Sequence, residues 1–97
     1  MIINFFDKGT EDIYNGENTK QARKKLPADL WKIAQRKFYF LDNASNLKDL
    51  KLPPSNYLEM LRGDRKGQYS IRINQQYRIC FYWTDEGIEH VEITDYH

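Results

Sequence analysis

The first part of the chain alternates short apolar runs with polar breaks, and this pattern predicts a strand followed by a helix. The apolar run at residues 2–6 ends at the polar stretch 7–9, which is typical of a strand closed by a turn. Thr10 is placed to cap a short helix that runs through Tyr14 and stops at an Asn-Gly pair. Residues 17–25 are almost wholly polar and basic, so they form either a mobile loop or the start of the next helix.

The clearest helical pattern begins at Pro27, because proline is favoured in the first turn of a helix. From there apolar residues recur at steps of three and four, which places them on one helix face. They are Leu30, Ile33, Ala34, Phe38, Leu41 and Ala44. Two prolines further on disfavour helix in the residues before them, so we expect residues 50–54 to be extended and to link two halves of the chain.

Beyond residue 57 the pattern changes to short alternating runs separated by polar turns, which is typical of strands. The runs cover residues 57–62, 68–74, 77–84 and 88–95, and they predict an antiparallel meander. We therefore predict one α+β domain over residues 1–97. In it, two N-terminal helices pack on one face of a small, mainly antiparallel sheet, in the order β-α-α-β-β-β-β.

Side chains alternate along a strand, and this alternation predicts the register of the middle hairpin. A three-residue turn after Ile73 puts Ile73 opposite Tyr77 and Ile71 opposite Ile79, all on one apolar face. A two-residue turn would instead pair Ile71 with Arg78 and mix apolar with charged residues. The three-residue turn is therefore favoured.

The same register predicts a second, polar face with two opposed arginines. It continues with Ile79 opposite Ile93 and Phe81 opposite Val91, and it sets Arg72 directly opposite Arg78. Opposed arginines repel each other unless an anion such as a phosphate lies between them. The alternative is that they pair with Glu59 or Glu92 on neighbouring strands. The other residues predicted for this face are Cys80, Tyr82, His90, Thr94 and Tyr96.

Composition adds an uneven distribution of charge along the 97 residues. Residues 1–47 carry 8 basic and 6 acidic groups, residues 48–78 carry 7 and 3, and residues 79–97 carry 0 and 5. A basic middle segment suits contact with a polyanion, although it is equally typical of a solvated surface. The single cysteine excludes an internal disulfide and a cysteine-based zinc site, and no apolar stretch is long enough to span a bilayer. We expect a cytoplasmic protein with no membrane contact.

Three motifs in the second half occur together in a specific order and spacing. They are Leu-x-Gly-Asp-Arg-x-Gly at residues 61–67, Ser-Ile-x-Ile-Asn-x-Gln-Tyr-Arg at 70–78, and Asp-Tyr-His at 95–97. With them the chain resembles the HigB toxins of the RelE superfamily, and their GraT-like branch most closely. The similarity is strong over residues 47–97, while the helical half agrees mainly in length and apolar spacing.

The resemblance implies a type II toxin that cuts translated messenger RNA in the decoding (A) site of the small ribosomal subunit. The cut would be made without metal or cofactor, with the adjacent ribose hydroxyl as nucleophile. The implied partner is a HigA-type helix-turn-helix antitoxin, through which alone the toxin would be linked to operator DNA.

The resemblance also implies the residues that act. The family's catalytic positions match Arg62, Arg78, Tyr96 and His97. Arginine suits charge stabilisation on a phosphate, His97 can exchange protons near neutral pH, and Tyr96 can stack on a base or orient the phosphate. Some members carry a histidine where this chain has Glu59, so the general base is left open. For contact with ribosomal RNA we predict Lys48, Lys51, Arg65, Lys66 and Arg72, with the basic residues of 20–25 as an open alternative.

Two other functions remain as alternatives. A ParE-like toxin would share the fold but would inhibit DNA gyrase by binding, without cutting RNA. An RNA-binding regulator without activity is the second, and Glu59 is the feature that keeps it open. The thiol of Cys80 is interpreted as a buried small side chain rather than a nucleophile.

Overall fold

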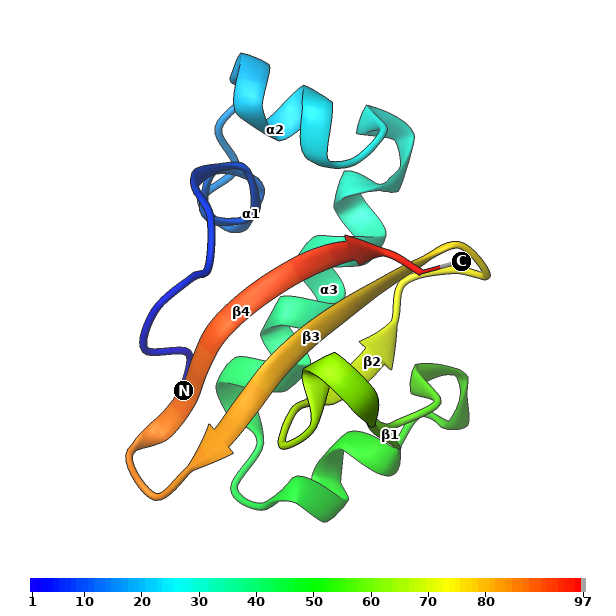
Figure 1. Cartoon of the computed structure of the whole chain (residues 1–97). Coiled ribbons are helices and arrows are strands. Elements are labelled where there is room, and N and C mark those ends of the chain that lie inside the picture. The colour runs from blue at the N-terminus through cyan, green and yellow to red at the C-terminus, as the bar shows by residue number, and fades with distance from the viewer. Residues whose placement is uncertain (97) are drawn as a thin grey trace.

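The chain folds into a helical first half and a four-stranded antiparallel sheet, shown in Figure 1. The computed structural model describes residues 1–96. The helices are α1 (Lys8–Tyr14), α2 (Lys20–Lys25) and α3 (Trp31–Asn43), and the strands are β1 (Glu59–Met60), β2 (Tyr69–Arg72), β3 (Tyr77–Thr84) and β4 (Gly87–Asp95). Short 3₁₀ turns lie between them: η1 (Ala28–Leu30), η2 (Leu47–Lys51), η3 (Pro54–Asn56) and η4 (Gly63–Arg65).

The sheet has the order β1-β2-β3-β4, and it separates the helices from the segment that carries η4. In Figure 1, α3 passes behind the sheet while η4 lies in front of it. The predicted α+β architecture, with helices on one face of a mainly antiparallel sheet, is confirmed. Within residues 1–96, no helix is long and apolar enough to cross a membrane.

The predicted first strand is reduced to two isolated bridges. Ile2 and Phe5 pair in parallel with Ile88 and Val91 of β4. Between these bridges the ladder is interrupted, because the backbone N–H of His90 donates to the side chain of Asn4 (2.6 Å) instead of to a backbone carbonyl. The N-terminal segment therefore lies along the outer edge of β4 without forming a regular strand.

The helical half differs from the prediction at its caps. Asp7, and not Thr10, caps α1, because its carboxylate accepts the backbone N–H of Thr10 at 2.7 Å. Residues 20–25 form a helix of their own, which Thr19 caps by accepting the backbone N–H of Ala22 at 3.1 Å. The helix predicted from Pro27 onward is present as η1 followed by α3.

The extended link predicted at residues 50–54 was wrong at both ends, because only Leu52 and Pro53 are extended and Pro54 begins η3. Leu50 and Lys51 belong to η2, whose start is fixed by a capping box between Asn46 and Asp49. The prolines restrict only the residue directly before each of them, so they leave Leu50 and Lys51 free to form this turn. The backbone becomes extended only at Leu52.

The register of the middle hairpin is confirmed. Ile71 pairs with Ile79, Arg72 pairs with Arg78, and the backbone N–H of Ile73 donates to the carbonyl of Tyr77 at 2.9 Å. β3 has the predicted bounds, whereas the predicted strand 57–62 shrinks to β1.

One part of the register prediction was wrong. Ile79 pairs with Ile93 as predicted, but the pairing shifts by one residue between Cys80 and Tyr82, where Phe81 was predicted opposite Val91. The reason is an extra residue in β4 near His90, whose backbone is left-handed with φ 55°.

The core lies between the sheet and the helices. It combines Ala34, Phe38 and Leu41 of α3 with the apolar residues of β2, β3 and β4, all nearly or fully buried. Leu30 and Ala44 of the predicted helix face are only partly buried against this core, and the prediction was wrong for Ile33, which is 38% exposed. Its largest fully buried side chains are Phe38, Phe81, Ile13, Leu26, Leu41 and Leu50. Burial on this one face leaves the opposite face of the strands available for polar chemistry.

Candidate active site

The face of the sheet that points away from the helices carries Ser70, Arg72, Arg78, Cys80 and Thr94, and we call it the polar face. Arg78 occupies its centre and is only 3% exposed. The Nε–H of Arg78 donates to the hydroxyl of Ser70 at 2.6 Å, and Nη2 donates to the carbonyl of Tyr57 at 2.7 Å. The guanidinium is therefore held in one orientation by two fixed oxygen acceptors.

The charge of Arg78 is balanced only in part. Its Nη2 lies 3.5 Å from a carboxylate oxygen of Glu59, whose side chain is 54% exposed. Burial lowers the pKa of the Arg78 guanidinium, and the carboxylate of Glu59 acts in the opposite direction. The prediction that Glu59 pairs with an arginine therefore holds for Arg78.

Arg72, opposite Arg78, has no carboxylate partner among residues 1–96. Its guanidinium carbon lies 4.1 Å from the centre of the Tyr57 ring, so a cation–π contact takes the place of an ion pair. Its Nε is buried and has no hydrogen-bond partner in this part of the chain. Glu92, the other predicted partner, is bound elsewhere. The arginine pair therefore has surplus positive charge.

Tyr96 joins this cluster at the end of β4. Its ring centre lies 5.6 Å from the guanidinium carbon of Arg78, and its backbone N–H donates to the carbonyl of Gln76 at 2.7 Å. The side chain is 40% exposed, so the ring is both positioned and accessible. Arg78 and Tyr96, predicted to act together, are adjacent. His97 lies outside the described residues.

Arg62 is placed differently from Arg78. It precedes η4 and is exposed, and its side chain makes no hydrogen bond or ion pair with residues 1–96. Its backbone is anchored because the N–H of the buried Leu61 donates to the carbonyl of Gln68 at 2.9 Å. Arg62 thus has a free charged group on a fixed segment.

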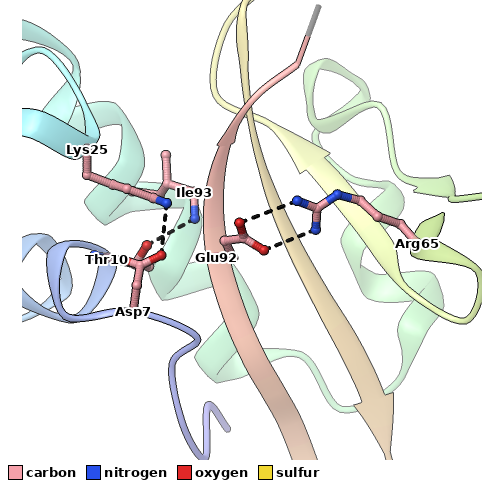
Figure 2. A network of polar contacts seen from close by, with 6 residues as sticks. All are labelled: Asp7, Thr10, Lys25, Arg65, Glu92 and Ile93. Carbon is pink, nitrogen blue, oxygen red and sulfur yellow. Dashed lines mark hydrogen bonds and ion pairs between the residues drawn. The ribbon is translucent and has the colours of Figure 1, made fainter.

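The five predicted RNA-binding cations are in different states. Arg65 is already bound, since its two terminal nitrogens contact the carboxylate of Glu92 at 3.0 and 3.3 Å, as Figure 2 shows. Lys48, Lys51 and Lys66 are exposed and free of ion pairs within residues 1–96. Arg65 ties η4 to β4 and so helps to cover the polar face.

Figure 2 also shows how β4 is held from its other side. The backbone N–H of Ile93 donates to the hydroxyl of Thr10 at 3.1 Å, and Asp7 forms an ion pair with Lys25 at 2.9 Å. These contacts join α1 and α2 to the strand that ends beside Arg78. The helical half therefore fixes the position from which Tyr96 extends.

Neither a cluster of metal-ligating side chains nor an exposed thiol is found in the described part of the chain. Residues 1–96 contain no group of three side chains able to hold a metal ion. Cys80 is fully buried, and burial raises the pKa of its thiol, which keeps the sulfur protonated.

Ser70 and Tyr57, which hold Arg78, were not predicted from the sequence. Ser70 lies on the polar face by the same alternation that places Arg72 there, so strand parity was a usable signal. Tyr57 contributes its carbonyl because its backbone is left-handed, with φ 45°. That conformation is rare for a tyrosine, and nothing in the sequence indicates it.

Comparison with solved structures bears on the fold. The chain is similar over its whole length to the YoeB-YefM toxin–antitoxin complex from Staphylococcus aureus, with a TM-score of 0.61, 18% identity and 98% of that chain covered. A second structure, the heterotetrameric complex of the same pair, matches equally well. The chain therefore shares its fold with these structures.

Comparison of sequences shows the family. A family model described as the RelE-like toxin HigB of type II toxin-antitoxin systems matches residues 3–97. Toxin HigB-1 of Vibrio cholerae serotype O1 is 41% identical over 85 residues, which is 88% of this chain and 86% of the relative. An uncharacterized Haemophilus influenzae protein is 34% identical over 70 residues, which covers 72% of this chain and 69% of that protein. The chain belongs to the HigB family of RelE-like type II toxins.

Proposed function

We propose that this toxin is a metal-independent endoribonuclease that cleaves messenger RNA on the ribosome. The observation that carries the proposal is the pairing of Arg78 with Tyr96 on the polar face. Arg78 is buried and oriented by Ser70 and Tyr57, and Tyr96 lies 5.6 Å from it with its ring accessible. A fixed guanidinium beside an open aromatic ring suits a phosphate and a splayed base.

The reaction is an attack of the ribose 2′-oxygen on the neighbouring phosphorus. The new O–P bond forms as the bond to the 5′-oxygen breaks, which leaves a 2′,3′-cyclic phosphate and a 5′-hydroxyl. One group must take the proton of the 2′-hydroxyl, and another must give a proton to the leaving 5′-oxygen. We assign charge stabilisation on the phosphoryl oxygens to Arg78 and Arg62.

Two groups are candidates for the proton transfers. Glu59 carries a half-exposed carboxylate 3.5 Å from Arg78, at the position where some relatives carry a histidine. His97 follows Tyr96 directly, and an imidazole titrates near neutral pH. We assign the proton acceptor to Glu59 and the proton donor to His97, with Tyr96 orienting the phosphate.

The partners follow from the same proposal. The substrate is messenger RNA in the A site of the small ribosomal subunit in the cytoplasm. There Lys48, Lys51 and Lys66 contact ribosomal RNA, and Arg72 contacts the bound RNA beside the polar face. A HigA-type helix-turn-helix antitoxin neutralises the toxin and links it to operator DNA. Support comes from the fold neighbours, which are toxins in complex with antitoxins.

The test is the mapping of 5′ ends on a message translated in vitro. We expect new ends with the wild type and a loss of at least about a hundredfold in cleavage rate for Arg78→Ala and Arg62→Ala. Arg62→Ala is the cleaner variant, because Arg62 makes no contact that the fold needs. Lys32→Ala serves as the control, since Lys32 is an exposed cation of α3 away from the polar face.

Two results would contradict the proposal. If wild-type protein arrested growth without new RNA ends and inhibited gyrase supercoiling, the protein would be a ParE-like toxin. If it bound programmed ribosomes without cleavage in a single turnover, it would be a regulator without activity.

A further inference from the structure

A groove of about 560 Å³ lies between α3 and the turn that joins β2 to β3. Its lining includes the cations Arg36, Lys37 and Arg72 and the aromatic rings of Phe40 and Tyr57. We call it the basic groove. All its lining residues belong to the described part of the chain, and none of them is acidic. The groove therefore concentrates positive charge in a concavity next to the polar face.

Lys37 is a buried lysine without an anionic partner. It is only 6% exposed, and its ammonium donates to the side-chain oxygen of Asn56 at 2.6 Å. Asn56 is neutral and fully buried, and its own amide donates to the carbonyls of Leu50 and Leu52. Burial lowers the pKa of Lys37, and the nearby charge of Arg36 lowers it further. An anion in the groove would relieve both effects, and the ammonium has donors left to bind it.

Arg72 supplies a second unsatisfied donor. Its Nε is buried without a hydrogen-bond partner, while its guanidinium lies on the Tyr57 ring at 4.1 Å. A buried N–H of this kind carries a desolvation cost until something accepts it. The two observations are independent, since Lys37 comes from α3 and Arg72 from β2. Both indicate an anion.

The groove adjoins the candidate active site at Tyr57, which lines the groove and also contacts Arg78. The carbonyl of Tyr57 accepts from Arg78, and the ring of the same residue carries Arg72. Tyr57 is 57% exposed, so its ring is accessible to a ligand. An extended chain of phosphates bound at Arg78 therefore has a path of cations to follow into the groove.

We propose that the basic groove holds the sugar–phosphate backbone of the RNA segment next to the cleaved nucleotide. This inference rests on the proposed function and adds a binding site for a neighbouring phosphate. Cations interleaved with accessible aromatic rings favour single-stranded RNA over an acidic peptide, because the rings can stack on bases while the cations hold phosphates.

Fluorescence anisotropy with a labelled single-stranded oligoadenylate of about ten nucleotides tests the proposal. We expect Arg36→Gln and Arg72→Gln each to weaken binding by roughly tenfold. Each should also lower the slope of log affinity against log salt by about 0.7, as expected for one phosphate contact on a single strand. Arg36→Gln decides the matter, because Arg36 is exposed and its side chain forms no hydrogen bond or ion pair within residues 1–96. Lys32→Gln, on the same helix but outside the groove, should leave both values unchanged.

Three outcomes would overturn the inference. One is the absence of saturable RNA binding by the wild type, and a second is unchanged affinity and salt slope in Arg36→Gln. The third is that Arg36→Gln weakens neutralisation by the antitoxin while RNA binding stays intact, which would make the groove a site for an acidic protein segment. Cleavage of translated messenger RNA by the wild type, measured in parallel, separates these results from a failure of the proposed function.

Discussion

The two faces of the sheet are built from the same strands but follow different rules. One row across β2, β3 and β4 contains Ile71, Ile79 and Ile93, and the next row contains Arg72, Arg78 and Thr94. The isoleucine row packs on the helices, where any well-fitting apolar side chain serves. The arginine row needs a particular partner at each position.

Burial does not distinguish the two faces. Arg78, Ser70 and Cys80 are as deeply buried as the isoleucines, because the segment that carries η4 lies over the polar face. What differs is the cost of removing a contact. Removing an apolar side chain costs packing in proportion to its size. Removing a charged side chain leaves its hydrogen-bond partners unsatisfied and removes the chemistry of the charged group.

The largest expected effect on stability is on the helix-facing row. Ile79→Ala should lower the free energy of unfolding by about 2–5 kcal/mol, because Ile79 is fully buried and its loss leaves a cavity. Urea denaturation measures the change. Ile33→Ala is the matched control, since Ile33 of α3 is 38% exposed and should cost less than about 1 kcal/mol. Equal losses in the two variants would contradict the expectation that burial makes the helix-facing row costly to change.

The next effect separates Arg78 from Arg62, the two arginines that we propose to be catalytic. Arg78→Ala should lower the free energy of unfolding by about 1–3 kcal/mol, because Ser70 and the carbonyl of Tyr57 lose a charged donor. Arg62→Ala should change it by no more than about 0.5 kcal/mol, since Arg62 is exposed. Thermal or urea unfolding checks both. A stable Arg78→Ala variant would show that the network around Arg78 does not hold the fold.

The helix-facing row was also the more predictable from sequence. The alternation along residues 71–81 specified which side chains face the helices and how β2 pairs with β3, because one face of each strand must be apolar. The prediction failed where tertiary contacts decide the local structure. α2 forms because Thr19, which caps it, also donates to the carboxylate of Asp12 in α1 at 2.5 Å. No periodicity within residues 17–25 encodes that contact.

The polar face was predicted in its residue types but not in its connections. Parity placed the two arginines together, and the motifs brought Tyr96 to them. The Tyr57 partner of Arg78 was not predictable in the same way, because the carbonyl of Tyr57 reaches Arg78 only through a left-handed backbone. Likewise, Arg65 was predicted to bind RNA on charge alone, and only the fold shows that Glu92 already occupies its guanidinium.

A smaller effect on stability is expected for the segment that carries η4 and covers the polar face. Arg65→Gln removes the ion pair with Glu92, in which the side chains are 31% and 13% exposed. Because the pair is partly screened by solvent, we expect a loss of about 0.5–1 kcal/mol in the free energy of unfolding. The loss should shrink at high salt. If the variant instead lowered stability as much as Ile79→Ala, the polar face would depend on this one ion pair.

The smallest effect concerns the reaction rate of the Cys80 thiol, which depends on how firmly the segment that carries η4 covers the polar face. Burial raises its pKa, so in the native protein it should react slowly with a disulfide reagent, and its rate should still rise with pH where an ordinary thiol has levelled off. Reaction then requires local opening of the segment over the polar face. Because Arg65→Gln weakens that segment by about 0.5–1 kcal/mol, it should speed the reaction by roughly two- to fivefold. Ile33→Ala, on the opposite side of the sheet, should alter the rate less. Fast reaction in the wild type at neutral pH would mean that the cover is open, and the polar face would then be a solvated surface rather than a built site.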